Sequence, residues 1–185
     1  MTNEAPRVGD PAPQPSLIGL DGKRTSLAGR WTDRPAVVSF LRYFGCPFCQ
    51  AWVGRLARGA DAFAGAGVGV VLIGQGTLGE ALGFTGPRRV PFEMLVDPDR
   101  SAYHAFGLVD GGPFQILAPA AVIGYVGVHV RGEGRQGGLH GGSLAQLPGT
   151  FVVDTAGVIR FAHRNRHQAD DPEVGELLAV CRSLG

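Results

Sequence analysis

A buried strand that leads directly into a helix, with two cysteines at the junction, limits the folds open to this chain more than any other feature. Residues 36–41 read Ala-Val-Val-Ser-Phe-Leu, a nearly continuous apolar run that is typical of a central strand covered on both faces. Gly45 and Cys46 end that run, and Pro47 suits the first position of a helix. From there apolar side chains recur every four residues along one helix face: Phe48, Trp52, Leu56 and Ala60. The sequence therefore predicts a strand, a cysteine-bearing turn and a helix, in that order.

The segments that follow alternate between strand and helix patterns. Residues 68–73 form a second buried strand, residues 77–84 a helix and residues 92–96 a third strand. This order favours parallel strands joined by helical crossovers. Ahead of it, an apolar stretch up to Leu20 and the turn signal Asp21-Gly22 predict an N-terminal hairpin.

The C-terminal part predicts a second hairpin and a last helix. Residues 150–154 and 158–163 flank Thr155-Ala156-Gly157 as antiparallel strands, and Asp171 and Pro172 are expected to cap and begin the helix. Between residues 107 and 146 an apolar segment and a glycine-rich loop form an insertion that can cover the active site.

Length and charge restrict the classes of function. The chain has 185 residues, so residues 1–185 are expected to form one domain with a sizeable core. With 17 basic and 16 acidic side chains the net charge is +1, which argues against a nucleic-acid partner. The first residues lack the apolar stretch of a signal or anchor, and the longest apolar run, 116–130, is shorter than the ~18 residues of a membrane span. We therefore expect a cytoplasmic protein without a membrane partner.

The motif Cys46-Pro47-Phe48-Cys49 carries the chemistry. Free amide groups and the helix dipole at the start of a helix favour a thiolate, which is the nucleophilic form of sulfur. Two cysteines at this spacing meet within one helical turn, so one can attack a substrate and the other can close a disulfide. Two alternatives stay open: the cysteines fill core space, or they form half of a zinc site with Cys181, His163 or His167.

Cys181 has a different pattern. Val174, Leu177, Leu178 and Cys181 follow the inward stripe of the last helix, so we interpret this cysteine as buried core. It is expected to stay unreactive towards mild peroxide while Cys46 and Cys49 are oxidised.

Three segments resemble the thioredoxin superfamily, and within it the peroxiredoxin-like (alkyl hydroperoxide reductase/thiol-specific antioxidant) branch with its peroxiredoxin-like 2 members. Residues 8–13 (Val-Gly-Asp-Pro-Ala-Pro) are similar to the peroxiredoxin opening, residues 40–49 to the active-site strand and turn, and residues 147–154 (Leu-Pro-Gly-Thr-Phe-Val-Val-Asp) to the thioredoxin-type proline loop. The resemblance implies an α/β thioredoxin-like fold, with a central mixed sheet flanked by helices. It also implies a cis Pro148 facing the disulfide and shaping the substrate groove.

The departures from the family pattern concern the attacking sulfur. If Cys49 is aligned with the attacking cysteine of peroxiredoxins, Arg42 stands in place of the family's proline and Cys46 in place of its threonine. Pro148 then stands at the position of the family's arginine. An alignment on thioredoxin instead makes Cys46 the exposed attacker and Cys49 the resolving cysteine, which we prefer because Cys46 is nearer the helix start and solvent. Arg42 is a candidate for the positive charge beside the thiolate. The alternative interpretation is a solvated arginine at the end of the strand. The basic cluster at residues 163–167 is interpreted as a solvated strand end.

A competing motif is Gly74-Gln-Gly-Thr-Leu-Gly79, which follows a strand and opens a helix as a dinucleotide fingerprint does. With 30 glycines in the chain such a pattern is expected about once by chance, and it recurs at Gly132, Gly134 and Gly137. A nicotinamide enzyme is therefore the minor alternative.

These observations predict a thiol-dependent antioxidant oxidoreductase that cycles Cys46 and Cys49 between dithiol and disulfide. It would reduce hydroperoxides or disulfides, be regenerated by thioredoxin or glutathione, and need no metal or organic cofactor. A homodimer is one expectation. The rival hypothesis is a glutaredoxin-like module that binds an iron–sulfur cluster or senses redox state without turnover.

Overall fold

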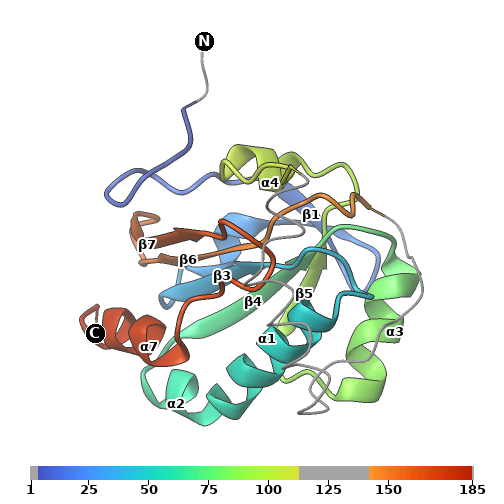
Figure 1. The fold of residues 1–185 in the computed structure, drawn as a ribbon. Coiled ribbons are helices and arrows are strands. Elements are labelled where there is room, and N and C mark those ends of the chain that lie inside the picture. The colour runs from blue at the N-terminus through green and yellow to red at the C-terminus, as the bar shows by residue number, and fades with distance from the viewer. Residues whose placement is uncertain (1–3, 113–141, 185) are drawn as a thin grey trace.

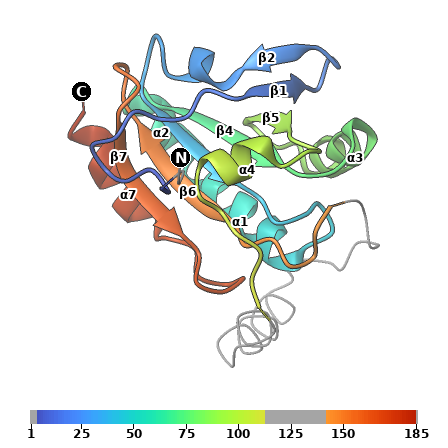
Figure 2. The ribbon, with the colours of Figure 1, turned by 90° about the horizontal axis from the view of Figure 1, so that it is seen from above.

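A computed structural model describes residues 4–112 and 142–184 of the chain. Its centre is a seven-stranded mixed sheet in the order β2-β1-β5-β4-β3-β6-β7. The strands are β1 Ser16–Gly19, β2 Arg24–Ser26, β3 Ala36–Phe40, β4 Gly69–Gly74, β5 Glu93–Val96, β6 Gly149–Val153 and β7 Ile159–Arg164. Figure 2 shows the β1–β2 hairpin at one edge of the sheet and β7 at the other.

The predicted central strand is β3, and all five of its residues are buried. It pairs in parallel with β4 and antiparallel with β6, and β4 pairs in parallel with β5. The predicted N-terminal hairpin is formed by β1 and β2, and the predicted C-terminal hairpin by β6 and β7. The α/β thioredoxin-like class is therefore confirmed.

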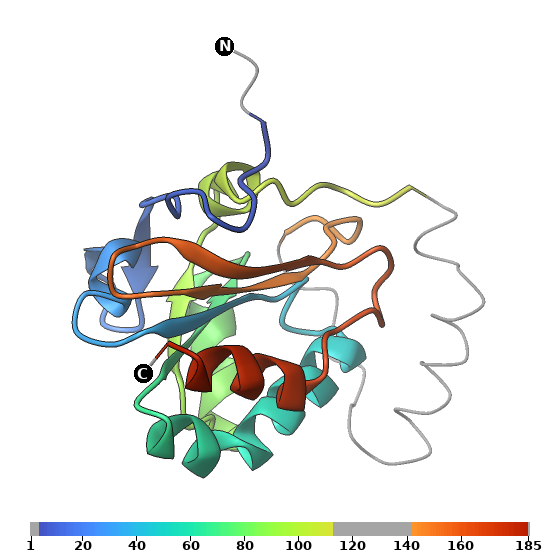
Figure 3. The same cartoon turned by 90° about the vertical axis from the view of Figure 1, so that its left-hand side faces the viewer.

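The helices are unequally divided between the two faces of the sheet. They are α1 Pro47–Arg58, α2 Ala60–Gly65, α3 Leu78–Arg88, α4 Ser101–Ala105 and α7 Val174–Arg182, with a short 3-10 turn η1 at Leu27–Arg30. Four of them, α1, α2, α3 and α7, lie on one face, and α4 lies on the other (Figures 1 and 3). Each face buries its own apolar cluster, one around Trp52, Leu56 and Leu177 and the other around Phe40, Tyr103 and Phe106.

Three of the predicted helices differ at their boundaries. The helix predicted at residues 77–84 is α3, which begins at Leu78 and extends to Arg88. The first helix ends at Arg58, and Ala60 belongs to α2. Gly59 at the break lies against α7, since a Cβ there would be 3.1 Å from Val174 Cγ1. The last helix begins at Val174 with Glu173 as its N-cap, so the predicted cap at Asp171 is wrong. The Asp171 carboxylate instead binds Arg55 of α1 at 2.7 Å and Asn165 at 2.9 Å.

The predicted insertion is described only at its two ends, and most of its glycine-rich loop lies outside the described residues. The two ends pair with each other. Gly111 donates to the Ala145 carbonyl at 2.8 Å and Leu147 to the Val109 carbonyl at 3.1 Å. The insertion therefore starts and finishes at one place, beside the start of β6.

The N-terminal segment runs along the start of β7, which is an edge strand. Gly9 donates to the Ile159 carbonyl at 2.8 Å, and Ile159 donates to the Asp10 carbonyl at 3.0 Å. Pro11 and Val158 form a further antiparallel bridge. In the residues described, no helix combines the length and the apolar character needed to cross a bilayer.

Candidate active site

The two cysteines lie at the junction between β3 and α1, at the carboxyl end of the parallel strands. Cys46 is the N-cap residue of α1 with an extended backbone, and Pro47 opens the helix. All three cysteines of the chain are free thiols. Since Cys49 occupies the first helical turn, its backbone N–H is one of the amides that lack an intrahelical acceptor.

The two thiols have opposite pKa shifts. A hydrogen bond from the Cys49 thiol, together with the Cys49 backbone N–H and the Arg42 charge, outweighs burial and lowers the pKa of Cys46 to about 7. Burial, reinforced by the hydrogen bond to Cys46 and its charge, raises the pKa of Cys49 well above its ordinary value. The arrangement thus favours one thiolate, at Cys46, and one thiol, at Cys49.

The expected exposure of Cys46 is wrong. Its exposed fraction is 0% and that of Cys49 is 4%, because both sulfurs pack into the apolar cluster beneath α1. A reactant can therefore reach Cys46 only after neighbouring groups move. The backbone N–H of Arg42 donates to Cys49 Sγ at 3.1 Å, so the inner sulfur is also held by the end of β3.

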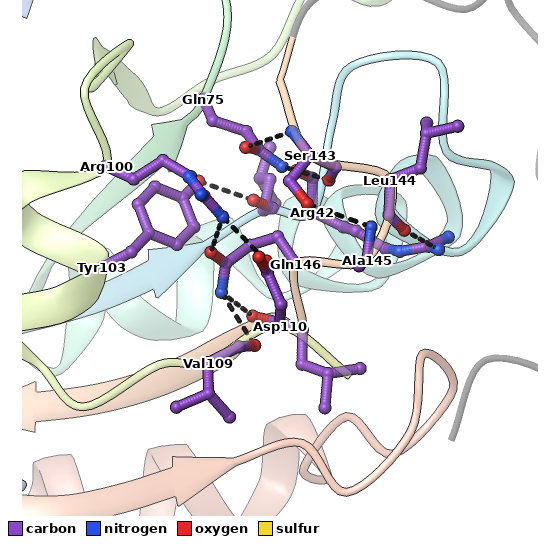
Figure 4. Close-up of polar contacts among 12 residues, drawn as sticks. Arg42, Gln75, Arg100, Tyr103, Val109, Asp110, Ser143, Leu144, Ala145 and Gln146 are labelled. Atoms are coloured by element: carbon purple, nitrogen blue, oxygen red, sulfur yellow. Dashed lines mark hydrogen bonds and ion pairs between the residues drawn. The ribbon is translucent and has the colours of Figure 1, made fainter. Parts of the chain in front are cut away.

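Arg42 is buried beside the thiols, with an exposed fraction of 6%. Its guanidinium donates to the Leu144 carbonyl (Figure 4). It also donates to Gln168 Oε1 at 2.7 Å and lies 5.2 Å from the centroid of the Tyr43 ring. Its buried Nε has no partner in the described part of the chain. The alternative of a solvated strand-end arginine is therefore wrong.

Gln75 is a site residue that the sequence analysis missed. It is fully buried at the end of β4, and its Nε2 donates to the Arg42 carbonyl and, at 2.8 Å, to the Ser143 carbonyl. Its Oε1 accepts from the Ser143 N–H at 2.8 Å. One amide thus joins the cysteine turn to the end of the insertion, as Figure 4 shows. A polar residue directly after a buried parallel strand was the available signal, because neighbouring parallel strands end at the same edge.

Tyr103 of α4 reaches the backbone before the cysteine turn from the other face of the sheet. Its hydroxyl donates to the Leu41 carbonyl at 2.6 Å and lies 3.0 Å from the Ile73 carbonyl. Burial raises the pKa of Tyr103 well above its ordinary value, so the hydroxyl keeps its proton. It therefore braces the peptide whose N–H faces Cys49.

Gln146 anchors the base of the insertion instead of the site. It is fully buried, its Nε2 donates to the Leu147 and Val109 carbonyls at 3.0 and 3.2 Å, and its Oε1 accepts from Arg100 at 3.2 Å. Arg100 also pairs with Asp110 at 2.7 Å. Figure 4 shows this group next to the one around Gln75.

Pro148 is buried directly before β6, and the described residues contain no cis peptide bond. The expected cis proline is therefore wrong. A trans peptide lets the chain run straight into β6, with the Pro148 carbonyl accepting from the Asn165 N–H at 3.1 Å. Continuing the β3–β6 register from Phe40 opposite Gly149 places Pro148 opposite Leu41.

The basic cluster at residues 163–167 is only partly solvated. Arg164 donates to the Phe106 carbonyl at 2.9 Å and to the Pro6 carbonyl, and Asn165 has an exposed fraction of 5%. Only Arg166 has the expected open position, with its side chain 83% exposed. The prediction of a solvated strand end is therefore wrong for Arg164 and Asn165.

The alternatives of a metal site and a dinucleotide site gain no support from the geometry. Within the described residues no group of three or more His, Cys, Asp or Glu side chains could hold a metal ion. Cys181 lies in the core at an exposed fraction of 1%, as predicted. Gly74 serves packing, because a Cβ there would lie 2.3 Å from the Phe44 ring.

Comparison with known proteins decides the family. The model of the family described as AhpC/TSA antioxidant enzyme matches residues 55–167. A "Thioredoxin-like protein AAED1, chloroplastic" from Arabidopsis thaliana is 30% identical over 178 residues, which cover 89% of this chain and 69% of that protein. This chain belongs to the AhpC/TSA family.

Further similarities agree with membership of the AhpC/TSA family. The human protein named "Peroxiredoxin-like 2C" is 26% identical over 178 residues, 89% of this chain and 76% of that protein. The crystal structure of peroxidoxin BcpB from Mycobacterium tuberculosis superposes with a TM-score of 0.71 at 19% identity, covering 97% of this chain and 98% of that one. The chain is thus a peroxiredoxin-like oxidoreductase of the AhpC/TSA family, whose function is thiol-dependent redox chemistry. The matched segment begins after Cys49, so the motif itself lies outside it.

Proposed function

We propose that this chain is a thiol peroxidase in which Cys46 attacks a hydroperoxide and Cys49 resolves the product. The observation that carries the proposal is the pair of opposite pKa shifts, which provides a thiolate at the helix start and a proton-bearing thiol one turn away. The proposed reductant is thioredoxin or glutathione, and the proposed compartment is the cytoplasm, where such systems keep thiols reduced. The single domain and the homodimer stay predictions.

The proposed cycle has three balanced steps. The Cys46 thiolate attacks the terminal peroxide oxygen, the O–O bond breaks, and the leaving alkoxide or hydroxide takes a proton to form an alcohol or water, which leaves a Cys46 sulfenic acid. The Cys49 sulfur then attacks the sulfenic sulfur, a disulfide forms and water leaves. One thioredoxin dithiol, or two glutathione molecules, finally supplies two electrons and two protons, which restores both thiols and leaves the reductant as a disulfide.

Arg42 is proposed to support the first step. Its charge lowers the pKa of Cys46, and its buried Nε, which has no partner among the described residues, is a donor close to the cysteine turn. Such a donor suits the peroxide oxygen on which charge develops. Pro148 is proposed to shape the wall opposite the end of β3 as a buried trans proline.

Intact-mass analysis after one equivalent of hydrogen peroxide tests the assignment. We expect Cys49→Ser to gain one oxygen on Cys46, Cys46→Ser to stay unmodified, and the wild type to lose two hydrogens as the disulfide forms. A sulfenic acid that persists on Cys49 in Cys46→Ser would reverse the roles of the two cysteines.

A disulfide reductase is the second candidate, since the same thiolate can attack a disulfide. When Cys49 is aligned with the attacking cysteine of peroxiredoxins, Arg42 and Pro148 replace two of the residues usual around it, which favours a disulfide reductase. Peroxide consumption measured beside insulin reduction separates the two activities. A brown protein after anaerobic purification would instead favour the iron–sulfur binding module.

A further inference from the structure

The chain between β7 and α7 brings one more side chain to the surroundings of the cysteines. Gln168 lies in this segment, and its Oε1 accepts a hydrogen bond from the Arg42 guanidinium at 2.7 Å. The segment folds back on itself, because the Asp170 carboxylate accepts from the Arg166 N–H at 2.8 Å. Gln168 lies between these two residues, so a hydrogen-bonded turn holds it in place.

The two carboxylates of this turn are directed away from Arg42. Asp170 pairs with Arg166 at 3.0 Å. Asp171 pairs with Arg55 of α1 at 2.7 Å. Both acidic residues follow the glutamine within three positions of the chain, but the side chain that meets Arg42 is the neutral amide.

Arg42 therefore keeps its positive charge without a carboxylate partner in the described part of the chain. Apart from Cys46, the groups that contact its guanidinium are uncharged: the Gln168 amide, the Leu144 carbonyl and the Tyr43 ring. Its exposed fraction of 6% leaves little water to screen the charge. The charge instead acts on the Cys46 sulfur, where it is one cause of the lowered pKa.

A neutral acceptor and a carboxylate would have different effects at position 168. An amide oxygen fixes the direction of a guanidinium and leaves its charge intact. A carboxylate in the same place would form a charge-assisted ion pair that compensates the charge. The sulfur would then face a pair of opposite charges, and its thiolate would lose stabilisation.

We propose that Gln168 is a positioning residue for the attack by Cys46: it holds Arg42 in place without neutralising it, so that the guanidinium charge acts on the sulfur. The inference rests on the proposed function for its catalytic meaning, because the stabilised thiolate is the one that would attack a hydroperoxide. Its effect on the thiolate can be measured without a peroxide.

The direct test is the pH dependence of Cys46 labelling by iodoacetamide in Gln168→Glu. We expect the midpoint to rise by about half a pH unit, so that labelling at pH 7 slows about two- to threefold. The difference from the wild type should vanish at pH 9, where the sulfur is ionised in both proteins. An unchanged midpoint would overturn the proposal, and so would a difference that persists at pH 9, because altered access would then be its cause.

Three further variants separate charge from contact. Gln168→Ala keeps Arg42 charged and should raise the midpoint less than Gln168→Glu does. His167→Glu adds the same charge at the neighbouring residue, whose side chain accepts from the Ala169 N–H, and should leave the midpoint unchanged. An equal effect of Gln168→Ala or of His167→Glu would overturn the role of neutrality at position 168.

A double substitution tests whether Gln168 acts through Arg42. In an Arg42→Met background, Gln168→Glu should have no further effect on the midpoint, and a shift as large as in the wild type would overturn the proposal.

Turnover tests the catalytic meaning of the residue. Gln168→Glu should lower kcat/KM for hydrogen peroxide at pH 7 at least twofold, while His167→Glu should leave it unchanged. Unchanged turnover in Gln168→Glu would overturn the positioning role. A shifted labelling midpoint in a protein without any peroxidase activity would refute the proposed function alone.

Discussion

The acidity of Cys46 depends first on one neighbouring side chain. The hydrogen bond from the Cys49 thiol is the largest cause of the lowered pKa, ahead of the backbone N–H of Cys49 and the charge of Arg42. Burial acts in the opposite direction on both sulfurs. In the proposed cycle the resolving cysteine is therefore also the residue that activates the attacking one.

Replacing Cys49 should move the pH dependence of Cys46 alkylation. In the wild type the rate should rise with pH around the Cys46 pKa of about 7, because the thiolate forms above that value. Cys49→Ala removes the donor, so the midpoint should shift upward and alkylation at pH 7 should slow about five- to tenfold. Cys49→Ser keeps a donor and should lie closer to the wild type. Iodoacetamide labelling followed by peptide mass mapping measures both, and identical midpoints in the two variants would contradict this account.

Cys181 should behave as an inert thiol. Both Cys181 and Cys46 are buried, but burial raises the pKa of Cys181 to about 11, whereas the pKa of Cys46 is lowered to about 7. Mild peroxide or iodoacetamide should modify Cys181 only after denaturation, while Cys46 reacts in the native protein. Quantitative labelling with and without urea checks this, and early loss of the Cys181 thiol would refute it.

The position of the two cysteines at a strand-to-helix junction could be predicted from the sequence because it depends on local pattern. A buried strand, two cysteines and Pro47 lie within 14 consecutive residues, residues 36–49. Burial of Cys46 could not be predicted, because it follows from tertiary packing in the apolar cluster around α1. The position of Gln75 after a buried strand was a signal, but its partner Ser143 lies 68 residues further along the chain and could not be predicted. The conformation of Pro148 likewise follows from its neighbours in β6 and β7.

At the scale of elements, periodicity predicted all the central strands and the first helix, but tertiary contacts determined where α7 begins. Asp171-Pro172 is a good helix start on local grounds. The structure uses the Asp171 carboxylate to join α1 to the end of β7 through Arg55 and Asn165, and the helix starts at Val174. Arg55 also lies 5.1 Å from the centroid of the Trp52 ring.

Substitutions before α7 should separate the role of Asp171, which joins α1 to the end of β7, from the role of Glu173, which caps α7. Asp171→Ala should lower the free energy of unfolding by about 1–3 kcal/mol, because it leaves Asn165 and Arg55 without their acceptor. Glu173→Ser should raise it by about 0.5–1 kcal/mol, since Glu173 is the N-cap and makes no side-chain capping bond. Urea denaturation measures both, and stability unaffected by Asp171→Ala would show that Asp171 does not join the elements.

At the scale of the whole molecule, the end of the insertion closes the cysteine turn. Residues 143–146 bind Gln75 and Arg42 on one side and the Val109–Asp110 segment on the other. Two buried glutamines therefore hold one segment, but only Gln75 connects it to the turn that carries Cys46.

Gln75→Ala should open the site while Gln146→Ala should not. Loss of the three Gln75 hydrogen bonds frees Ser143 and the Arg42 carbonyl, so alkylation of Cys46 should accelerate at least fivefold at pH 7. Gln146→Ala removes an equally buried amide that contacts only the base of the insertion and Arg100. Labelling rates measured equally far below the melting temperature of each variant test this. Equal rates in both variants would contradict a closing role for Gln75.

The N-terminal segment has a consequence for association between molecules. An uncovered edge strand offers its backbone groups to any other extended chain. Residues 9–12 occupy that position at the start of β7, and Arg164 binds the Pro6 carbonyl further along the strand. A chain shortened to begin after Pro13 would leave this side of the sheet unpaired, and concentrated solutions of it should form aggregates rich in intermolecular β-structure.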